Sequence, residues 1–269
     1  MSRTLVEVIS MASALERRAE FAAAAAATGS RFTFVDAATS APLGVPHDPR
    51  AATRRFGRPL TPAEVGCFAS HHAAWQRLLD GGDEQRIVLE DDVMVDWPAL
   101  DGLARADFSA LGLDFIRFYS THPFRYSPVI TRFSSPHRHL VRARGMFLGS
   151  QGYLFTRRAA QAFVAGARAI TMPVDWYLGR YWEFGFPNYC LFPFPVIERE
   201  TVSHIGHRPE TKSARAADQA ALWLGRARDR LAREWCDRVR LRGLPFGRTP
   251  DFGPTFLERF GRPLEVLSK

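Results

Sequence analysis

The fold is decided by residues 61–92, which read TPAEVGCFASHHAAWQRLLDGGDEQRIVLEDD. Thr61 stands at the N-cap position of a predicted helix, Pro62 at N1 and Glu64 at N3, and these three signals agree on where the helix begins. A glycine pair then stops it, so the sequence predicts a helix over 62–80. Its hydrophobic residues recur every three or four positions, which indicates one face packed on a sheet.

The apolar run 87–89 predicts a buried strand that ends in three acids, Glu90, Asp91 and Asp92. Ligands of open α/β sheets bind at the carboxyl ends of strands, so these acids occupy a functional position. Glu90 and Asp92 are two residues apart and share one face of the strand, whereas Asp91 points to the other. Such carboxylates suit a divalent cation, although a solvated acidic turn would explain the same residues without a ligand.

Further strands and helices alternate along the chain and predict an α/β fold. We expect a loop over 40–60, where prolines and glycines are frequent, and a flexible basic loop over 120–146. The residues Ser13 to Glu16 have the spacing of a capping box that opens the first helix. Strands are expected at 5–9, 31–36, 114–119, 147–155 and 190–197, and helices at 13–29 and 157–168.

Composition favours a globular enzyme domain. The chain has 269 residues, of which 46% are hydrophobic and 24% charged, enough to bury the core of an α/β domain. We place a catalytic domain at 1–212 and a C-terminal extension at 213–269. Three cysteines without metal-ligand spacing disfavour a disulfide scaffold or a zinc knuckle and favour a reducing compartment.

The formal net charge is +8, and all but two of the 36 basic residues are arginines, a bias that indicates a bacterial source. Arginine offers paired donors to phosphate, so the charge is compatible with a phosphorylated donor or an anionic membrane surface. We do not expect nucleic acid as a partner, because no nucleic-acid-binding motif accompanies the charge.

Residues 214–243 predict a basic amphipathic helix. Such a helix either packs on its own domain or docks on an anionic bilayer. Because we find neither a secretory signal nor an 18-residue apolar run, we expect a cytoplasmic protein that associates peripherally with the inner face of the membrane. The apolar stripe of the helix consists of Ala220, Leu224, Ala227, Leu231, Trp235 and Val239.

An ordered set of motifs runs through roughly residues 4–206 and resembles glycosyltransferase family 25. That family includes bacterial lipopolysaccharide and lipooligosaccharide galactosyltransferases and the collagen galactosyltransferases. The motifs are, in order, Glu64-x-Gly66-Cys67-x-x-Ser70-His71-x-x-x-Trp75, Ile87-x-Leu89-Glu90-Asp91-Asp92-Val93, the run 152–160, Pro173-Val174-Asp175 and Ser203-His204-Ile205-Gly206.

The resemblance implies a GT-A-type, Rossmann-like nucleotide-sugar-binding domain with a mixed, mainly parallel sheet. It also implies a UDP-sugar donor, often UDP-galactose, a saccharide or glycolipid acceptor, inversion at the anomeric carbon, and Mn²⁺ or Mg²⁺ as cofactor. Ser10-Met11-Ala12 departs from the family pattern, which has an Asn in this loop. The implied donor-binding residues are Arg17, Ser70, His71, Glu90, Asp91, Asp92, Gly152 and Tyr153, and the implied metal ligands are Glu90, Asp92 and His204.

Asp175 is the candidate catalytic base, because inverting transfer needs one group that takes the proton of the acceptor hydroxyl. The same residue is explained equally well as the N-cap of a helix that begins with Trp176. His71 and Glu183 are the next candidates for the base, although a lone helical histidine is more simply a hydrogen-bonded structural residue. The alternative function is an inactive or hydrolytic relative that binds a nucleotide sugar.

Overall fold

The computed structural model describes residues 4–199, 216–240 and 254–261. His204, the third implied metal ligand, lies outside these residues, as does the proposed boundary at 212 between two domains. No helix among the described residues is both long enough and apolar enough to cross a lipid bilayer.

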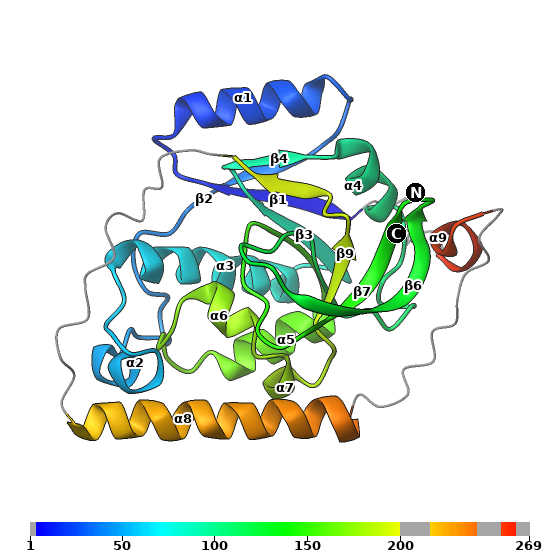
Figure 1. Cartoon of the computed structure of the whole chain (residues 1–269). Coiled ribbons are helices and arrows are strands. Elements are labelled where there is room, and N and C mark those ends of the chain that lie inside the picture. The colour runs from blue at the N-terminus through cyan, green and yellow to red at the C-terminus, as the bar shows by residue number, and fades with distance from the viewer. Residues whose placement is uncertain (1–3, 200–215, 241–253, 262–269) are drawn as a thin grey trace.

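The described part of the chain contains ten strands and nine α-helices. The α/β class predicted from the sequence is confirmed (Figure 1). The strands are β1 Leu5–Ser10, β2 Thr33–Asp36, β3 Gln85–Glu90, β4 Val93–Val95, β5 Phe115–Arg117, β6 Arg125–Ser135, β7 Arg138–Arg144, β8 Gly152–Thr156, β9 Tyr189–Phe192 and β10 Val196–Glu198. The helices are α1 Leu15–Ala26, α2 Pro49–Arg55, α3 Pro62–Asp80, α4 Trp97–Leu103, α5 Arg157–Gly166, α6 Val174–Leu178, α7 Tyr181–Phe184, α8 Ala216–Trp235, which a π-helical turn Cys236–Arg240 continues, and α9 Phe256–Phe260.

Eight of the strands form one mixed sheet in the order β2-β1-β3-β8-β5-β9-β7-β6, and β10 pairs with β4 in a second, small sheet. Three neighbouring pairs in the large sheet are parallel and four are antiparallel. The expectation of a mainly parallel sheet is therefore wrong. One reason is that β6 and β7 are joined by only two residues, which forces an antiparallel pair.

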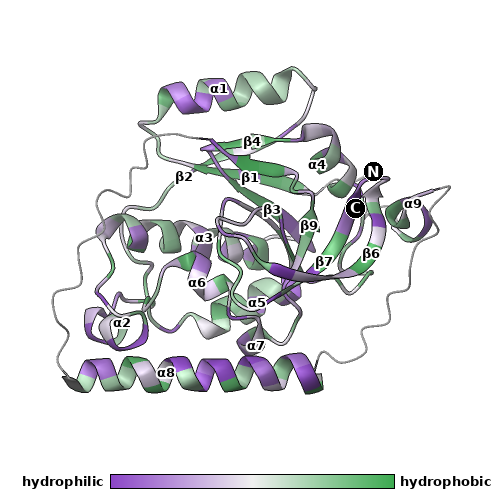
Figure 2. Cartoon of the chain, in the orientation of Figure 1, coloured by the Kyte–Doolittle hydropathy of each residue, from purple (hydrophilic) through white to green (hydrophobic). Residues whose placement is uncertain are grey.

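Helices cover both faces of the large sheet and create two hydrophobic cores. Helices α1 and α4 pack on one face, while α3, α5 and α6 pack on the other (Figure 1). Side chains of β3 alternate between the cores: Ile87 and Leu89 enter the first and Val88 the second. All three are fully buried, so β3 is a central strand, and the hydropathy colouring shows it within an apolar centre (Figure 2).

Helix α3 begins as predicted, with a capping box in which the side chains of Thr61 and Glu64 each accept a hydrogen bond from the other's backbone. The Glu64 carboxylate also takes two hydrogen bonds from Arg58, of 2.8 and 2.6 Å. Trp75 is fully buried in the second core, which confirms that its side of the helix packs on the sheet. Helix α3 is thus fixed at its start and along its length.

Other local predictions were wrong. The expected loop over 40–60 contains α2, which Asp48 caps, and the expected loop over 120–146 is largely the β6–β7 hairpin. The expected capping box of α1 is absent, because its N-cap is Ala14. The apolar run 190–197 forms two strands in different sheets, β9 and β10, and the strand expected from 147 begins only at β8.

Helix α8 packs on the body through polar contacts and, near its C-terminal end, a small apolar cluster with Trp182, rather than through its apolar stripe. Asp229 takes hydrogen bonds of 2.5 and 2.6 Å from Arg180, which lies just before α7. Along the stripe, by contrast, Leu224, Leu231 and Trp235 are 61%, 71% and 59% exposed. The stripe predicted from the sequence therefore exists, and it faces away from the domain.

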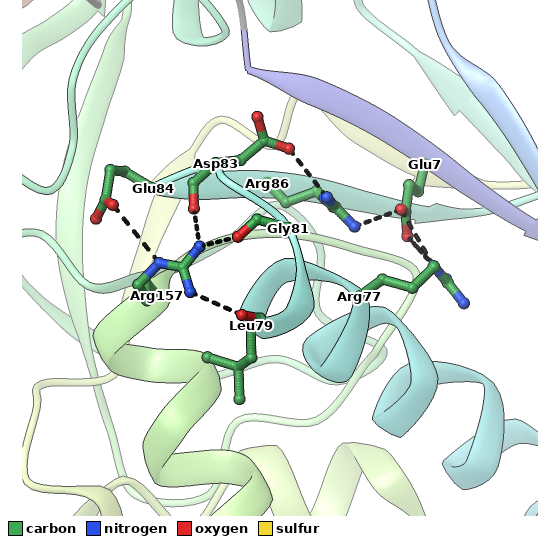
Figure 3. A network of polar contacts seen from close by, with 8 residues as sticks. All are labelled: Glu7, Arg77, Leu79, Gly81, Asp83, Glu84, Arg86 and Arg157. Carbon is green, nitrogen blue, oxygen red and sulfur yellow. Dashed lines mark hydrogen bonds and ion pairs between the residues drawn. The ribbon is translucent and has the colours of Figure 1, made fainter. Parts of the chain in front are cut away.

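A buried polar network joins β1, β3 and α3 (Figure 3). Glu7 of β1 lies between two arginines: Arg86 of β3 donates to it at 2.6 Å and Arg77 of α3 at 2.8 Å. Glu7 and Arg86 are 6% and 5% exposed, so neither charge is hydrated. A buried ion pair is stable only while both partners remain, so this network locks the two strands and the helix together.

We predict that Arg86→Met lowers the free energy of unfolding by about 3 kcal/mol, because it leaves the buried Glu7 carboxylate with a single cation. The control is Glu84→Gln, which removes an exposed partner of Arg157 (Figure 3) and should change stability by less than ~0.5 kcal/mol. Urea denaturation of both variants gives the comparison. Equal losses would show that the network contributes no more than a surface ion pair.

Candidate active site

A cavity of about 460 Å³ opens at the carboxyl ends of β1, β2 and β3, beside the N-terminal half of α3. Gly66 lets α3 approach the segment after β2 closely in the cavity wall, since a Cβ at this position would lie 2.5 Å from the backbone oxygen of Ala38. Ser70 holds the same wall by accepting a hydrogen bond of 2.8 Å from the Ala38 amide. Six of the expected donor-binding residues line this cavity, namely Arg17, Ser70, His71, Glu90, Asp91 and Asp92.

Asp91 is anchored within the fold. Its carboxylate accepts a hydrogen bond of 2.6 Å from the Ser10 hydroxyl and lies 3.3 Å from the Arg17 guanidinium. The Ser10 hydroxyl in turn accepts a hydrogen bond from Arg18. Ser10, which stands where the family pattern differs, thus connects the end of β1 to the acids after β3.

Two neighbouring side chains stabilise the Glu90 carboxylate. Ser150 donates a hydrogen bond of 2.6 Å to its Oε1, and Nε2 of His71 lies 3.4 Å from the same oxygen. Burial disfavours the carboxylate, but His71 and Ser150 outweigh burial, so the pKa of Glu90 is lowered. Glu90 is therefore an anion that faces the cavity.

Asp92 differs from its two neighbours because no side chain among the described residues donates a hydrogen bond to it. Burial, followed by the charges of Glu90, Asp91 and Glu198, raises its pKa to about 7. Its Oδ1 is buried and has no hydrogen-bond partner within the described part of the chain. A buried carboxylate among three others is unfavourable unless a cation is present, so these residues fit a divalent ion with oxygen ligands.

Glu198 is a site residue that we did not predict. It ends β10, whose pairing with β4 places it opposite Val93 and next to the acids after β3. The Tyr119 hydroxyl donates a hydrogen bond of 3.1 Å to its carboxylate. The signal was available, because Glu198 follows an apolar run in the same way as Glu90 follows 87–89.

His71 is fully buried and connects the cavity to the core. Trp75 donates a hydrogen bond of 3.0 Å to the Tyr153 hydroxyl, which lies 2.8 Å from Nδ1 of His71. A hydroxyl that accepts from Trp75 can donate its own proton to Nδ1, which leaves the protonated Nε2 facing Glu90. This arrangement agrees with a structural role for His71.

Gly152 and Tyr153 lie in β8, behind the cavity rather than on its wall. Tyr153 is fully buried, and its hydroxyl contacts the cavity residue His71. A Cβ at Gly152 would lie 3.0 Å from the Leu89 side chain and 3.2 Å from that of Val196. The glycine therefore permits close packing beneath the acids.

Cys67 lines the cavity and also packs against the second hydrophobic core. Its Sγ lies within 4.8 Å of ligand atoms of His71 and Glu90, a set that would suit a thiophilic ion. Burial, with the charges of Glu90, Asp175 and Asp92 adding to it, raises the pKa of the Cys67 thiol well above its usual value. A neutral thiol is a poor ligand, so the oxygen-rich group around Asp92 fits a metal better.

Asp175 lies in the first turn of α6 and is half-buried. The N-cap of this helix is Pro173, so the interpretation of Asp175 as the cap is wrong, although Asp175 Oδ1 accepts a hydrogen bond of 2.8 Å from the Trp176 amide. The fully buried Arg117 donates to the Asp175 backbone oxygen at 3.2 Å. Burial lowers the pKa of Arg117 to about 10, and the negative charge of Asp175 acts against this shift.

Comparison with known proteins agrees with the motifs. The family model described as "Glycosyltransferase family 25 (LPS biosynthesis protein)" matches residues 4–178. The lacto-N-neotetraose biosynthesis glycosyltransferase LgtE of Neisseria meningitidis is 29% identical over 193 residues, which cover 65% of this chain and 64% of LgtE. The procollagen galactosyltransferase 1 of Danio rerio is 41% identical over 51 residues, which cover 19% of this chain and 8% of that protein.

A third relative has a different description. The probable inactive glycosyltransferase 25 family member 3 of Bos taurus is 45% identical over 51 residues, or 19% of this chain and 9% of that protein. Short matches of this kind support family membership and leave activity open. Because the family model covers well over half of the chain, from the first strand to the end of α6, the protein belongs to glycosyltransferase family 25.

Proposed function

We propose that the protein is an inverting, metal-dependent glycosyltransferase with a GT-A-type fold that moves a hexose, most simply galactose, from a UDP-sugar to a saccharide acceptor. The acceptor is a lipopolysaccharide, a lipooligosaccharide or another cell-surface glycan. The observation that carries the proposal is the unbalanced Asp92 carboxylate in a cavity at the carboxyl ends of three parallel strands.

The residues that would hold the ion are Glu90 and Asp92, with Glu198 beside them and His204 outside the described residues. A bound Mn²⁺ or Mg²⁺ would neutralise the charge of the departing nucleoside diphosphate. Arg17 lies at the cavity wall and pairs with Asp91, so it is available as a second cation near the diphosphate.

Asp175 is the group that we propose to take the proton. As the acceptor oxygen forms its bond to the anomeric carbon, its proton passes to the Asp175 carboxylate and the bond to the diphosphate breaks on the opposite face. Two observations support this role. Arg117 donates a hydrogen bond to the Asp175 backbone oxygen. The negative charge of Asp175, like those of Glu90 and Asp92, raises the pKa of Cys67 in the cavity wall.

The alternative is a relative that binds a nucleotide sugar and hydrolyses it or does nothing. The same acids would then hold metal and nucleotide, and only the response to an acceptor separates the two functions. A transferase releases UDP faster when an acceptor saccharide is added, whereas a hydrolase releases it at the same rate.

An anionic membrane surface is the further partner that we propose, and α8 is the element that would contact it. Its outward side carries exposed Trp223, Leu224, Leu231 and Trp235 together with exposed arginines such as Arg230. Apolar and aromatic side chains flanked by arginine are typical of helices that lie in the membrane interface. A lipid-linked acceptor would require such a contact.

We predict that Asp92→Asn stabilises the metal-free protein at pH 8. The pKa of Asp92 in the folded protein is about 7, above its unfolded value, so ionisation disfavours folding and stability falls as the pH rises from about 4 through 7. Asn cannot ionise, so the melting temperature in EDTA at pH 8 should rise by ~2–4 °C and this gain should vanish near pH 4.

The same variant tests the metal site. Adding Mn²⁺ should raise the melting temperature of the wild type and leave that of Asp92→Asn unchanged. The matched control is Asp80→Asn, which removes an exposed charge at the opposite end of α3. An Mn²⁺ shift that persists in Asp92→Asn would refute the assigned ligands.

We predict that Asp175→Asn retains UDP binding in the presence of Mn²⁺ and lowers transfer to an acceptor by about a hundredfold or more, because it removes the proton acceptor. The assay measures UDP release from several UDP-sugars, each with and without acceptor saccharides. Glu183→Gln is the matched comparison, since Glu183 is the next candidate base and pairs with Arg55 and Arg180. Near-normal transfer by Asp175→Asn would exclude it as the base.

We predict that the wild type sediments with phosphatidylglycerol vesicles at low salt and much less at high salt. Trp223→Ser with Leu231→Ser should weaken binding by about tenfold or more, because these side chains lose their burial in the bilayer. Leu15→Ser with Leu43→Ser is the control, as both residues are exposed elsewhere on the surface. Equal binding by the two double variants would show that α8 does not contact the membrane.

A further inference from the structure

A second cavity, of about 500 Å³, lies between the β6–β7 hairpin and the C-terminal part of α8 with its π-helical turn. In the strand order of the large sheet, this cavity lies far from the acids after β3. Arg142 in its wall pairs with Tyr189 at the amino end of β9, whereas the acids follow the carboxyl end of β3. Five arginines line it, namely Arg125, Arg142, Arg144, Arg233 and Arg238.

The hairpin places like charges directly opposite one another. Arg125 of β6 and Arg144 of β7 are cross-strand partners, and Arg142 is two residues from Arg144 on the same side of β7. Arginines in this arrangement repel one another and destabilise the strand pair. A bound anion would remove that cost.

Acidic neighbours balance only part of this charge. Among the described residues, two acids line the cavity against five arginines. Glu234 is paired with Arg238 at 3.2 Å, and Asp237 accepts a hydrogen bond of 2.8 Å from the Tyr181 hydroxyl. Arg144 donates to a neutral group, the Ser127 hydroxyl, at 2.8 Å.

The cavity is also built from elements that fix the arginines. Tyr181 joins the π-helical turn to α7 through Asp237, and Arg233 lies 5.9 Å from the centre of the Trp182 ring. The α8 side of the cavity is thus tied to the domain, while the hairpin supplies the other side as part of the large sheet. Guanidinium groups held from two directions suit a tetrahedral anion, which accepts paired hydrogen bonds from each.

We propose that this cavity is a binding site for a phosphate group, separate from the donor cavity. The phosphate belongs either to an anionic lipid headgroup or to a phosphorylated saccharide, because both present the same group and a cavity of about 500 Å³ admits either. The site stands on its own observations and does not require the proposed transferase activity.

The test uses the whole chain and inorganic phosphate, titrated by calorimetry in EDTA at constant ionic strength. The wild type should show saturable binding of one phosphate, and Arg125→Gln with Arg144→Gln should weaken it at least tenfold. Both arginines are exposed, so the variant should fold. The control is Arg31→Gln with Arg105→Gln, which removes two exposed charges elsewhere and should bind as the wild type does.

Vesicles then identify the source of the phosphate. Reduced binding of the Arg125/Arg144 variant to phosphatidylglycerol vesicles, relative to the control, assigns the site to a lipid headgroup. Unchanged vesicle binding with lost phosphate binding assigns it to a soluble or glycan phosphate. The proposal is overturned if the wild type binds no phosphate saturably, or if the Arg125/Arg144 variant binds it as tightly as the control.

Discussion

The need to stabilise three carboxylates after a buried central strand governs the arrangement around the cavity. Asp91 is balanced by Ser10 and Arg17, so β1 and α1 must lie beside the end of β3. Glu90 is balanced by Ser150 and His71, which brings in β8 and α3. Asp92 receives no such partner within the described residues, so it is the one of the three acids that most needs a bound cation.

The opposite end of the same strands is rigid for a related reason. Glu7 is held between Arg77 and Arg86, so β1, β3 and α3 cannot slide relative to one another without leaving a charge unpaired. A site that must hold a cation and a diphosphate needs ligands placed to within a fraction of an ångström. The buried network therefore contributes to function by fixing the strands that carry the acids.

Local signals explain which parts of the fold and site could be predicted. Thr61, Pro62 and Glu64 specify the start of α3 without help from distant residues, and the prediction was confirmed. The β6–β7 hairpin could not be read in this way, because its arginine-rich strands show no clear alternation and are stabilised by pairing with β9. Arg117 and Ser150 reach the site only through long-range packing, so no sequence pattern marked them.

The sequence predicted the apolar stripe of helix α8 but not which side of the helix contacts the domain. Its apolar stripe was predicted, yet the helix contacts the domain through Asp229 and Asp237, on the side away from the stripe. Ion pairs, hydrogen bonds and a small apolar cluster fix its orientation, whereas Leu231 and Trp223 stay exposed at a cost in solvation. A helix attached by one side and exposed along its apolar stripe is arranged to offer that stripe to a partner. The arginine cavity at its C-terminal end adds positive charge to the same region, which makes an anionic partner the one that both features favour.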